Sequence, residues 1–352
     1  MTASEELKIA EGPCPESVAD LETVLSTPSE SVVEMFARLE GHLLMVGAGG
    51  KMGPTMVRMA QRAIEQSGST MQLTAVSRFT NADTQRKLET QGVRTIACDL
   101  LQPDQVSQLP DCSHLINLSG FKFGAAAQPE MTWATNCDIP NTLCRRFDDT
   151  KIVAFSTGNV YGDVPVHSGG CIESDELRPV GEYAMAALGR ERMFQYYCTQ
   201  LNIPTVLVRL NYATELRYGV LVDIAQSVID GEPIDLSTGY VNVIWQGDAN
   251  ALALRCLEQT QVPANILNLT GPAVVSVKEV AKRVAEFAEV SVEFKGSENE
   301  TALLSQAAQN YPQIRTPRFS METMVRWTTE WIQKGGPTLG KPTKFNVTDG
   351  KF

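Results

Sequence analysis

A short apolar run that ends in three regularly spaced glycines constrains the fold of this chain more than any other feature. The run covers residues 43–46, and Gly47-x-x-Gly50-x-x-Gly53 follows it directly. Apolar residues then recur at helical spacing over residues 57–64. A strand, a glycine turn and a helix in this order predict a cradle for a phosphate group. The glycines let the backbone approach the anion closely, and the helix N-terminus favours its negative charge.

The sequence after the glycines alternates apolar runs with helical stretches. We expect strands at residues 43–46, 72–77, 95–98, 115–118, 151–155 and 205–210. Between them we expect helices at residues 53–67, 82–91, 130–147 and 181–201. Such alternation predicts an α/β fold with a doubly wound parallel sheet, which has helices on both faces and binds its ligands beyond the carboxyl ends of the strands.

Past residue 210 the pattern changes and predicts a smaller second domain. Helices are expected at residues 220–230 and 276–288, with short strands near residue 244 and at 266–269. We therefore expect a dinucleotide-binding (Rossmann) domain and a discontinuous C-terminal substrate domain. The expected ranges are 41–210 and about 236–262 for the first, and about 211–235 and 263–333 for the second.

The two ends of the chain are expected to lie outside these domains. Residues 1–40 are predicted to form an N-terminal extension, poorly ordered or draped over the surface up to about residue 28, with a short helix at 29–40. Residues 334–352 are rich in Gly, Pro and Lys and are expected to form a tail that wraps the surface.

Composition bounds the class of protein and its partners. The chain has 352 residues, a net charge of -11 at pH 7 and 43% hydrophobic residues, which indicates a soluble globular protein without a nucleic-acid or membrane partner. No apolar run approaches the roughly 20 residues of a membrane span. The N-terminus has no basic-then-apolar signal region, so we expect a cytoplasmic protein. The 8 cysteines lack metal-binding spacing, so we expect reduced thiols and no metal site.

The end of the second predicted strand bears on the choice of dinucleotide. An acidic side chain here would bind the ribose hydroxyls of NAD, whereas an arginine nearby accommodates the additional phosphate of NADP. The chain has Ser77-Arg78 at this point, which favours NADP. The alternative is that Arg78 stacks on the adenine or faces solvent, and NAD then remains a candidate.

Further motifs follow the predicted strands in a defined order. Asp99-Leu100 follows the third strand, Asn117-Leu118-Ser119-Gly120 follows the fourth, and Asn136 lies on the next helix. Ser156-Thr157-Gly158-Asn159-Val160-Tyr161-Gly162 ends the fifth strand, and Tyr183 and Glu191 lie on the helix after it. Over roughly residues 43–290 this order resembles the extended short-chain dehydrogenase/reductase family, the NAD(P)-dependent sugar epimerases and dehydratases.

The resemblance implies roles for these residues. Asp99 would contact the adenine, Thr157 would hydrogen-bond the reacting substrate oxygen, and Tyr183 would be the acid/base. Gly120-Phe121-Lys122 is similar to the Gly-Leu-Lys of UDP-galactose epimerases, which implies that Lys122 contacts the cofactor pyrophosphate. The expected cofactor-binding residues are Gly47, Gly50, Lys51, Met52, Gly53, Ser77, Arg78, Asp99, Leu100, Leu118, Ser119, Gly120, Lys122, Asn136 and Tyr183.

One position departs from the family pattern. Hydride transfer from an alcohol carbon needs a base for the hydroxyl proton, and a tyrosine with a pKa of roughly 10 needs a nearby cation to act as that base. In the family a lysine four residues after the tyrosine supplies this cation, but Ala187 stands at that position here. Either catalysis has been lost and a cofactor-binding protein remains, or the cation comes from Arg190 or Lys122.

The residues after Thr157 narrow the reaction. Sugar 4,6-dehydratases have Asp-Glu there, whereas this chain has Gly158-Asn159, which disfavours dehydration and leaves dehydrogenation, keto reduction or epimerisation. Arg217 suggests a carboxylate or phosphate on the substrate, hence a sugar acid or nucleotide sugar, unless it is an ordinary surface arginine. The candidate substrate contacts are Phe121, Phe123, Asn159, His167, Asn211, Tyr212 and Arg217.

We therefore expect an oxidoreductase or epimerase that uses NADP or NAD and acts on a hydroxyl group of a carbohydrate. A non-catalytic dinucleotide-binding or redox-sensing protein is the alternative, because of Ala187. The resemblance also implies a homodimer that forms through the helices at 130–147 and 181–201.

Overall fold

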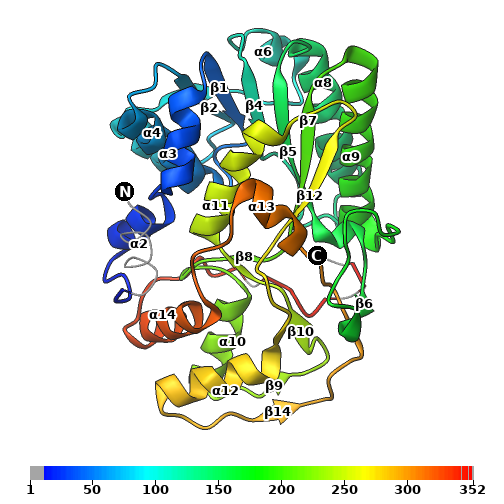
Figure 1. Cartoon of the computed structure of the whole chain (residues 1–352). Coiled ribbons are helices and arrows are strands. Elements are labelled where there is room, and N and C mark those ends of the chain that lie inside the picture. The colour runs from blue at the N-terminus through cyan, green and yellow to red at the C-terminus, as the bar shows by residue number, and fades with distance from the viewer. Residues whose placement is uncertain (1–11, 342, 348, 351–352) are drawn as a thin grey trace.

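A parallel sheet of seven strands forms the centre of the larger part of the molecule, in the order β12-β7-β5-β4-β1-β2-β3 (Figure 1). The computed structural model describes residues 12–341, 343–347 and 349–350. All neighbouring strands of this sheet pair in parallel. The strands are β1 (His42–Val46), β2 (Gln72–Ser77), β3 (Arg94–Ala97), β4 (His114–Asn117), β5 (Lys151–Thr157), β7 (Thr205–Leu210) and β12 (Asn265–Leu269).

Helices cover both faces of the sheet. One face packs against α3 (Glu30–Arg38), α4 (Gly53–Ser67) and α11 (Gln246–Arg255), and the other against α6 (Pro103–Ser107), α8 (Ile139–Arg146) and α9 (Gly181–Leu201). Successive side chains of a strand point to opposite faces, so Leu43 of β1 lies in one core and Leu44 in the other. The predicted doubly wound α/β fold is confirmed.

The crevice that binds ligands in such a sheet lies where the strand order reverses. Here β1 lies between β2 and β4, and Val46 at the end of β1 pairs with Asn117 at the end of β4. The glycine turn leaves β1 at this point, and the Leu118-Ser119-Gly120 segment leaves β4 beside it. The two motifs predicted to bind a dinucleotide therefore meet at the same edge of the sheet.

The helix expected at residues 130–147 consists of three segments. These are α7 (Pro129–Trp133), the π-helical η1 (Ala134–Asp138) and α8. Pro140 has no N–H group and cannot donate the usual helical hydrogen bond to the carbonyl of Asn136, which suits a locally wider turn. This irregularity leaves Asn136 fully buried at the point where the helix changes type.

The boundary expected at residue 263 is wrong for β12. Residues 265–269 pair with β7 in the central sheet, with Ile266 opposite Leu207 and Leu267 opposite Val208. The side chains of Leu267 and Leu269 complete the core on the α4 face. A short apolar run shows that a strand is present, but it does not show which sheet the strand joins.

A smaller region lies below the central sheet in Figure 1. Its helices α10 (Val220–Ile229), α12 (Val277–Ala288) and α14 (Met321–Gln333) pack against one another. Trp245 stacks on Phe319 with ring centres 5.0 Å apart, and Trp327 packs edge-on against both. The remaining elements are α5 (Ala82–Thr90), α13 (Tyr311–Ile314) and the short strands β6 (Val164–Pro165), β8 (Ala213–Thr214), β9 (Ile234–Asp235), β10 (Tyr240–Val241), β11 (Ile244–Trp245), β13 (Val275–Ser276), β14 (Phe294–Lys295) and β15 (Thr301–Ala302).

The N-terminal extension was expected to be poorly ordered or draped over the surface, and this is wrong for its described part. Residues 18–25 form α2 (Val18–Leu25), whose N-cap Ser17 accepts a hydrogen bond from the backbone nitrogen of Asp20. Leu21 and Leu25 are fully buried in the core of the smaller region. The helix is short and its apolar stripe is narrow, so its burial depends on tertiary contacts that the local sequence does not display. Residues 1–11 lie outside the described part of the chain.

A buried ion pair joins α9 to the sheet. Arg209 of β7 donates two parallel hydrogen bonds to Glu191 of α9, at 2.9 Å and 2.7 Å, and the two side chains are 1% and 0% exposed. The hydroxyl of Ser156 on β5 also donates to Glu191. Arg209 further donates to the hydroxyl of Tyr161, which donates to Asn268 of β12. One charged pair thus connects three neighbouring strands to the helix that carries Tyr183.

Neutralising Glu191 is expected to destabilise the fold strongly. The variant Glu191→Gln leaves the Arg209 guanidinium buried without a counter-charge, which costs about 3–5 kcal/mol of unfolding free energy. Denaturant-induced unfolding would measure this loss. The matched control is Glu176→Gln, because Glu176 pairs with Arg178 in an ion pair whose side chains are 74% and 68% exposed. The control should lose less than about 1 kcal/mol. Equal losses in the two variants would contradict the role given to the buried pair.

Candidate active site

The glycine turn between β1 and α4 has no room for side chains. Gly47 has a φ of +77°, and a Cβ atom there would lie 2.6 Å from the backbone nitrogen of Ser119. A Cβ atom at Gly53 would overlap the carbonyl group of Ala48, so α4 packs directly against the turn. Pro54 occupies the first turn of α4, where the absent N–H group is not needed. The turn and the start of α4 therefore have the geometry that fits a pyrophosphate.

Two cavities adjoin at this turn and share Gly47, Gly50, Leu118 and Gly120 as walls. The outer cavity, of about 410 Å³, extends along the ends of β2 and β3. The inner cavity, of about 360 Å³, extends along the ends of β5 and β7. Together they follow the carboxyl edge of the sheet, where a doubly wound fold binds its ligand.

The outer cavity contains the residues predicted to bind the adenine half of a cofactor. Asp99 is half-buried, and its Oδ1 accepts a hydrogen bond from the backbone nitrogen of Leu101 at 3.1 Å. The side chain of Arg78 is exposed at the rim. Phe121 also lines this cavity and not the inner one, so the structure does not place it beside the predicted substrate position. The predicted residues that line the outer cavity are Ser77, Arg78, Asp99, Leu100, Leu118, Ser119 and Gly120.

The inner cavity brings Thr157 and Tyr183 together. Thr157 ends β5, Tyr183 lies in the first turn of α9, and both side chains line the cavity. Thr157 is 6% exposed, and its hydroxyl donates a hydrogen bond to Oδ1 of Asn159 at 2.8 Å. The other predicted residues that line this cavity are Lys51, Met52, Gly53, Lys122, Phe123, Asn159, Asn211 and Tyr212.

Two lysines of the inner cavity are partly or largely withdrawn from water. Burial lowers the pKa of Lys122 to about 8. Burial, and then the positive charges of Lys341 and Lys122, lower the pKa of Lys51 to about 8, while Asp223 opposes the shift. Two desolvated ammonium groups that repel each other favour a ligand with negative charge.

Aromatic rings surround these ammonium groups. Nζ of Lys51 lies 3.4 Å from the ring centre of Tyr218 and 4.0 Å from that of Phe123. Nζ of Lys122 lies 5.5 Å from the ring centre of Tyr183. These cation–π contacts hold Lys51 near Tyr218 and Lys122 near Tyr183, and they compensate part of the hydration that the two ammonium groups lose on burial.

The helix face that follows Tyr183 carries an apolar residue at the position where the resemblance predicts a lysine. Ala187 is fully buried and packs against Val160, Tyr161 and Cys171. Arg190 is 4% exposed; it donates a hydrogen bond from Nη1 to the carbonyl of Ser119 at 2.8 Å and forms a side-chain hydrogen bond with Tyr183. Burial lowers the pKa of Arg190, and the charges and hydrogen bond of its neighbours oppose that shift.

Two predicted site residues, Asn136 and His167, line neither cavity, and a third, Asn211, is almost fully buried in the wall of the inner one. Asn136 is fully buried outside both cavities and donates to the carbonyl of Thr132 at 2.8 Å, so it supports the segment under Gly120. Asn211 is 2% exposed, and its amide group occupies the space that a Cβ atom at Gly158 would need. His167 is exposed and lines neither cavity.

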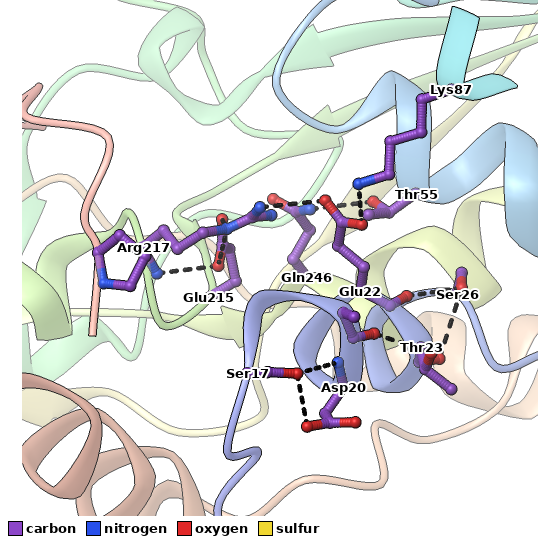
Figure 2. A network of polar contacts seen from close by, with 12 residues as sticks. Ser17, Asp20, Glu22, Thr23, Ser26, Thr55, Lys87, Glu215, Arg217 and Gln246 are labelled. Atoms are coloured by element: carbon purple, nitrogen blue, oxygen red, sulfur yellow. Dashed lines mark hydrogen bonds and ion pairs between the residues drawn. The ribbon is translucent and has the colours of Figure 1, made fainter. Parts of the chain in front are cut away.

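Arg217, predicted to bind a substrate anion, is engaged with two carboxylates. Figure 2 shows its guanidinium between Glu215, with an Nε–Oε1 distance of 3.0 Å, and Glu22 of α2, with an Nη1–Oε1 distance of 3.3 Å. Glu22 also pairs with Lys87. The long-range partner Glu22 is not visible in the local sequence. These contacts anchor α2. They also neutralise the Arg217 guanidinium, which was the predicted partner of a substrate anion.

The C-terminal segment, which means the described residues among 338–350, forms part of the cleft. The sequence did not predict this position. The segment crosses between the sheet domain and the smaller region (Figure 1). Thr343 lines the inner cavity and donates to Asp223 from its backbone nitrogen at 2.8 Å and from its hydroxyl at 2.5 Å. Val347 packs against Tyr183, and Gly350 lies against Gly181 at the start of α9. The segment does not simply wrap the outer surface, and nothing in its composition indicates the cleft as its position.

Within residues 12–341, 343–347 and 349–350, no group of three His, Cys, Asp or Glu side chains is placed to hold a metal ion. No helix in those ranges has both the length and the apolar character to span a membrane.

The fold and the glycine turn are those of a Rossmann-type dinucleotide-binding domain. Residues 43–213 match the model of the NAD dependent epimerase/dehydratase family, as the motifs in this part of the chain predict. No curated protein matches the chain by sequence.

Solved structures of such enzymes share the fold. UDP-glucose 4-epimerase of Thermus thermophilus, solved with NAD, aligns with a TM-score of 0.66 and 18% identity, over 83% of this chain and 99% of its own. The dTDP-glucose 4,6-dehydratase of Bacillus anthracis, also solved with NAD, aligns with a TM-score of 0.68 and 15% identity, over 83% of this chain and 96% of its own. UDP-glucuronic acid 4-epimerase of Bacillus cereus, solved with UDP-glucuronic acid and NAD, aligns with a TM-score of 0.68 and 15% identity, over 83% of this chain and 99% of its own. The likeness therefore includes the smaller C-terminal region as well as the sheet.

A side chain at Gly47 is expected to cost more unfolding free energy than the left-handed backbone conformation alone accounts for. Gly47→Ala adds a clash with the backbone of Ser119, whereas Gly68→Ala, at a φ of +66°, meets no atom within 4 Å. The control should lose only about 1–2 kcal/mol of unfolding free energy, the usual cost of the left-handed region. Gly47→Ala should lose more and should also weaken NAD binding, measured by calorimetry. Equal stability losses and unchanged NAD affinity would contradict the close approach described for this turn.

Proposed function

We propose that the chain is an NAD(P)-dependent oxidoreductase or epimerase that acts by hydride transfer on a hydroxyl group of a carbohydrate, a sugar acid or a nucleotide sugar. The observation that carries this proposal is the joint placement of Thr157 and Tyr183 in one cavity beside the glycine turn. One observation favours a non-catalytic dinucleotide-binding or redox-sensing protein instead, namely the buried Ala187 at the position of the family lysine.

The residues of the inner cavity divide the proposed chemistry between them. A bound nicotinamide would accept the hydride from the alcohol carbon. Thr157 would donate its hydroxyl hydrogen to the substrate oxygen, which requires the hydroxyl to turn away from Oδ1 of Asn159, the acceptor that it has in this structure. Tyr183 would take the proton of the substrate hydroxyl and return it when the reaction runs in reverse.

The groove formed by the two cavities would hold the cofactor. The space that the glycines leave free fits a pyrophosphate, and Lys122 and Lys51 would add positive charge. Ser77, Arg78, Asp99 and Leu100 would contact the adenosine half, with Phe121 on that side as well. The nicotinamide half would lie against Met52, Leu118, Ser119, Gly120 and Tyr183, and Asn136 would support the backbone beneath.

The substrate class is proposed from the cleft and from the solved relatives. The Bacillus cereus and Thermus thermophilus structures are of enzymes named for UDP-glucuronic acid and UDP-glucose. Phe123, Asn159, Asn211 and Tyr212 are the proposed contacts, whereas His167 and Arg217 are left out because of their positions.

Tyr183→Phe is expected to lower turnover by roughly 10²–10⁴-fold, the usual contribution of a positioned acid/base. The assay follows reduced nicotinamide, or interconverted sugar, on a panel of nucleotide sugars and sugar acids after the cofactor released by denaturation has been identified by mass spectrometry. Tyr196→Phe is the matched control, because Tyr196 is on the same helix and is 57% exposed. If the wild type is as inert as Tyr183→Phe on every substrate while it binds cofactor, the non-catalytic alternative replaces the enzyme.

The cofactor preference proposed from Arg78 can be tested separately. The solved relatives contain NAD, but the chain has no acidic side chain at Ser77 or Arg78 to repel the phosphate of NADP. Arg78→Ala should weaken NADP binding about tenfold, the effect of one charge-assisted hydrogen bond, and leave NAD binding unchanged. Arg178→Ala, at another exposed arginine, should change neither. If NAD binds more tightly than NADP, and Arg78→Ala changes neither affinity, the cofactor is NAD.

A homodimer and a cytoplasmic location remain predictions. In support of the dimer, exposed apolar side chains lie on the two helical segments that the resemblance assigns to the interface. They are Met131 and Trp133 on α7 and Met185 and Tyr196 on α9, each at least 38% exposed.

A further inference from the structure

We propose that Arg190 supplies the cation that Tyr183 needs as acid/base and so takes the place of the lysine that is absent at residue 187. The inference rests on the proposed function and assigns a residue role within that same site. The guanidinium stays protonated throughout. It donates a hydrogen bond to the phenol oxygen and stabilises the phenolate that accepts the substrate's hydroxyl proton, so the proton moves between substrate and Tyr183 only.

The helix geometry brings the two residues together. Arg190 follows Tyr183 by seven residues, two turns of α9, so both lie on one face of the helix. Side chains on a helix lean toward its N-terminus, which directs the long arginine back over Ala186 and Ala187 toward Tyr183. Both alanines are fully buried and small, so the arginine occupies the course that a lysine at 187 would have taken. A side-chain hydrogen bond then joins Arg190 to Tyr183.

The guanidinium is buried without a carboxylate partner. Arg190 is 4% exposed and forms no salt bridge with an acidic side chain among the residues that the structure describes. Its neighbour Glu191 is already paired with Arg209. Its Nε is buried and has no hydrogen-bond partner in the described part of the chain. A buried cation is costly unless an anion compensates it. The side chains whose negative charge acts on Arg190 are Tyr183, Glu191 and Cys137, and of these three Tyr183 alone lines the inner cavity.

Backbone contacts fix the position of the guanidinium beside the cofactor groove. Nη1 donates to the carbonyl of Ser119 at 2.8 Å. A Cβ atom at residue 120 would lie 2.6 Å from that same Nη1, so a side chain there would displace the guanidinium from its present position. Ser119 and Gly120 are walls of the groove, and Arg190 therefore lies directly behind it.

Lys122 is the competing cation. In the described part of the chain, the charged and titratable groups that face Tyr183 include Arg190 from α9, Lys122 from the segment after β4, and Tyr218 from the segment before α10. Burial lowers the pKa of Lys122 to about 8, so it loses its charge in the alkaline range where a guanidinium keeps it. The two candidate cations can therefore be distinguished by mutation. If Arg190 is the cation, its neutral variants shift the pH dependence of turnover; if Lys122 is the cation, its neutral variant does.

The test compares variants that separate charge from hydrogen bonding. Arg190→Gln keeps a donor for the Ser119 carbonyl but removes the charge, Arg190→Met is a second neutral variant, and Arg190→Lys keeps the charge. Arg192→Met is the matched control, because Arg192 is exposed on the same helix. Formation of the Tyr183 phenolate is followed by near-ultraviolet absorbance against pH, with the matching Tyr183→Phe protein subtracted in each background. Turnover is measured over the same pH range.

We expect the pH at which the phenolate forms, and the pH at which turnover rises, to increase by about one unit or more in Arg190→Gln and Arg190→Met. Turnover near neutrality should fall about tenfold or more in these two neutral variants, Arg190→Lys should recover part of that loss, and the control Arg192→Met should stay close to wild type. Unchanged phenolate formation in a folded neutral variant would overturn the proposal, as would a shift produced by Lys122→Met alone. The absorbance measurement needs no turnover, so it decides the role of Arg190 even if every sugar proves inert and the proposed function fails.

Discussion

The ion pair between Arg209 and Glu191 is the interaction on which the geometry of this molecule depends. It is buried, bidentate and hydrogen-bonded through Ser156, Tyr161 and Asn268, so each charge has the partners that a low-dielectric interior requires. Those partners come from β5, β7, β12 and the segment after β5. The helix α9 is therefore held in one rotation about its axis and at one height against the carboxyl edge of the sheet.

That fixed rotation determines which side chains of α9 reach the cleft. Glu191 points to the strands, and the residue before it in the sequence is turned by about a quarter of a turn, since an α-helix has 3.6 residues per turn. Arg190 consequently faces the segment after β4, and Tyr183, two turns earlier, faces the inner cavity. A structural ion pair on one side of the helix and the proposed proton-transfer residues on the other are thus parts of one arrangement.

Local sequence patterns were sufficient for the sheet domain and for the residues at its carboxyl edge. The glycine turn, Thr157 and Tyr183 each sit where a strand or helix begins or ends, and such boundaries leave a signal in neighbouring residues. Features that depend on distant contacts left no such signal. The pairing of β12 with β7, the burial of α2 and the pairing of Arg217 with Glu22 each join residues far apart in the chain. The spacing of Arg190 from Tyr183 suggested one helix face, but only the structure reveals the contact with Ser119 and the need for Gly120.

The C-terminal segment forms part of the walls of three separate cavities. Thr343 forms part of the inner cavity, while Phe345 stands between a cavity of about 570 Å³ beside α10 and one of about 130 Å³ that Val347 and Gly350 also line. A displacement of this one segment changes the shape of all three spaces at once. A ligand that displaced the segment from one of these spaces would therefore change the free energy of binding in the other two.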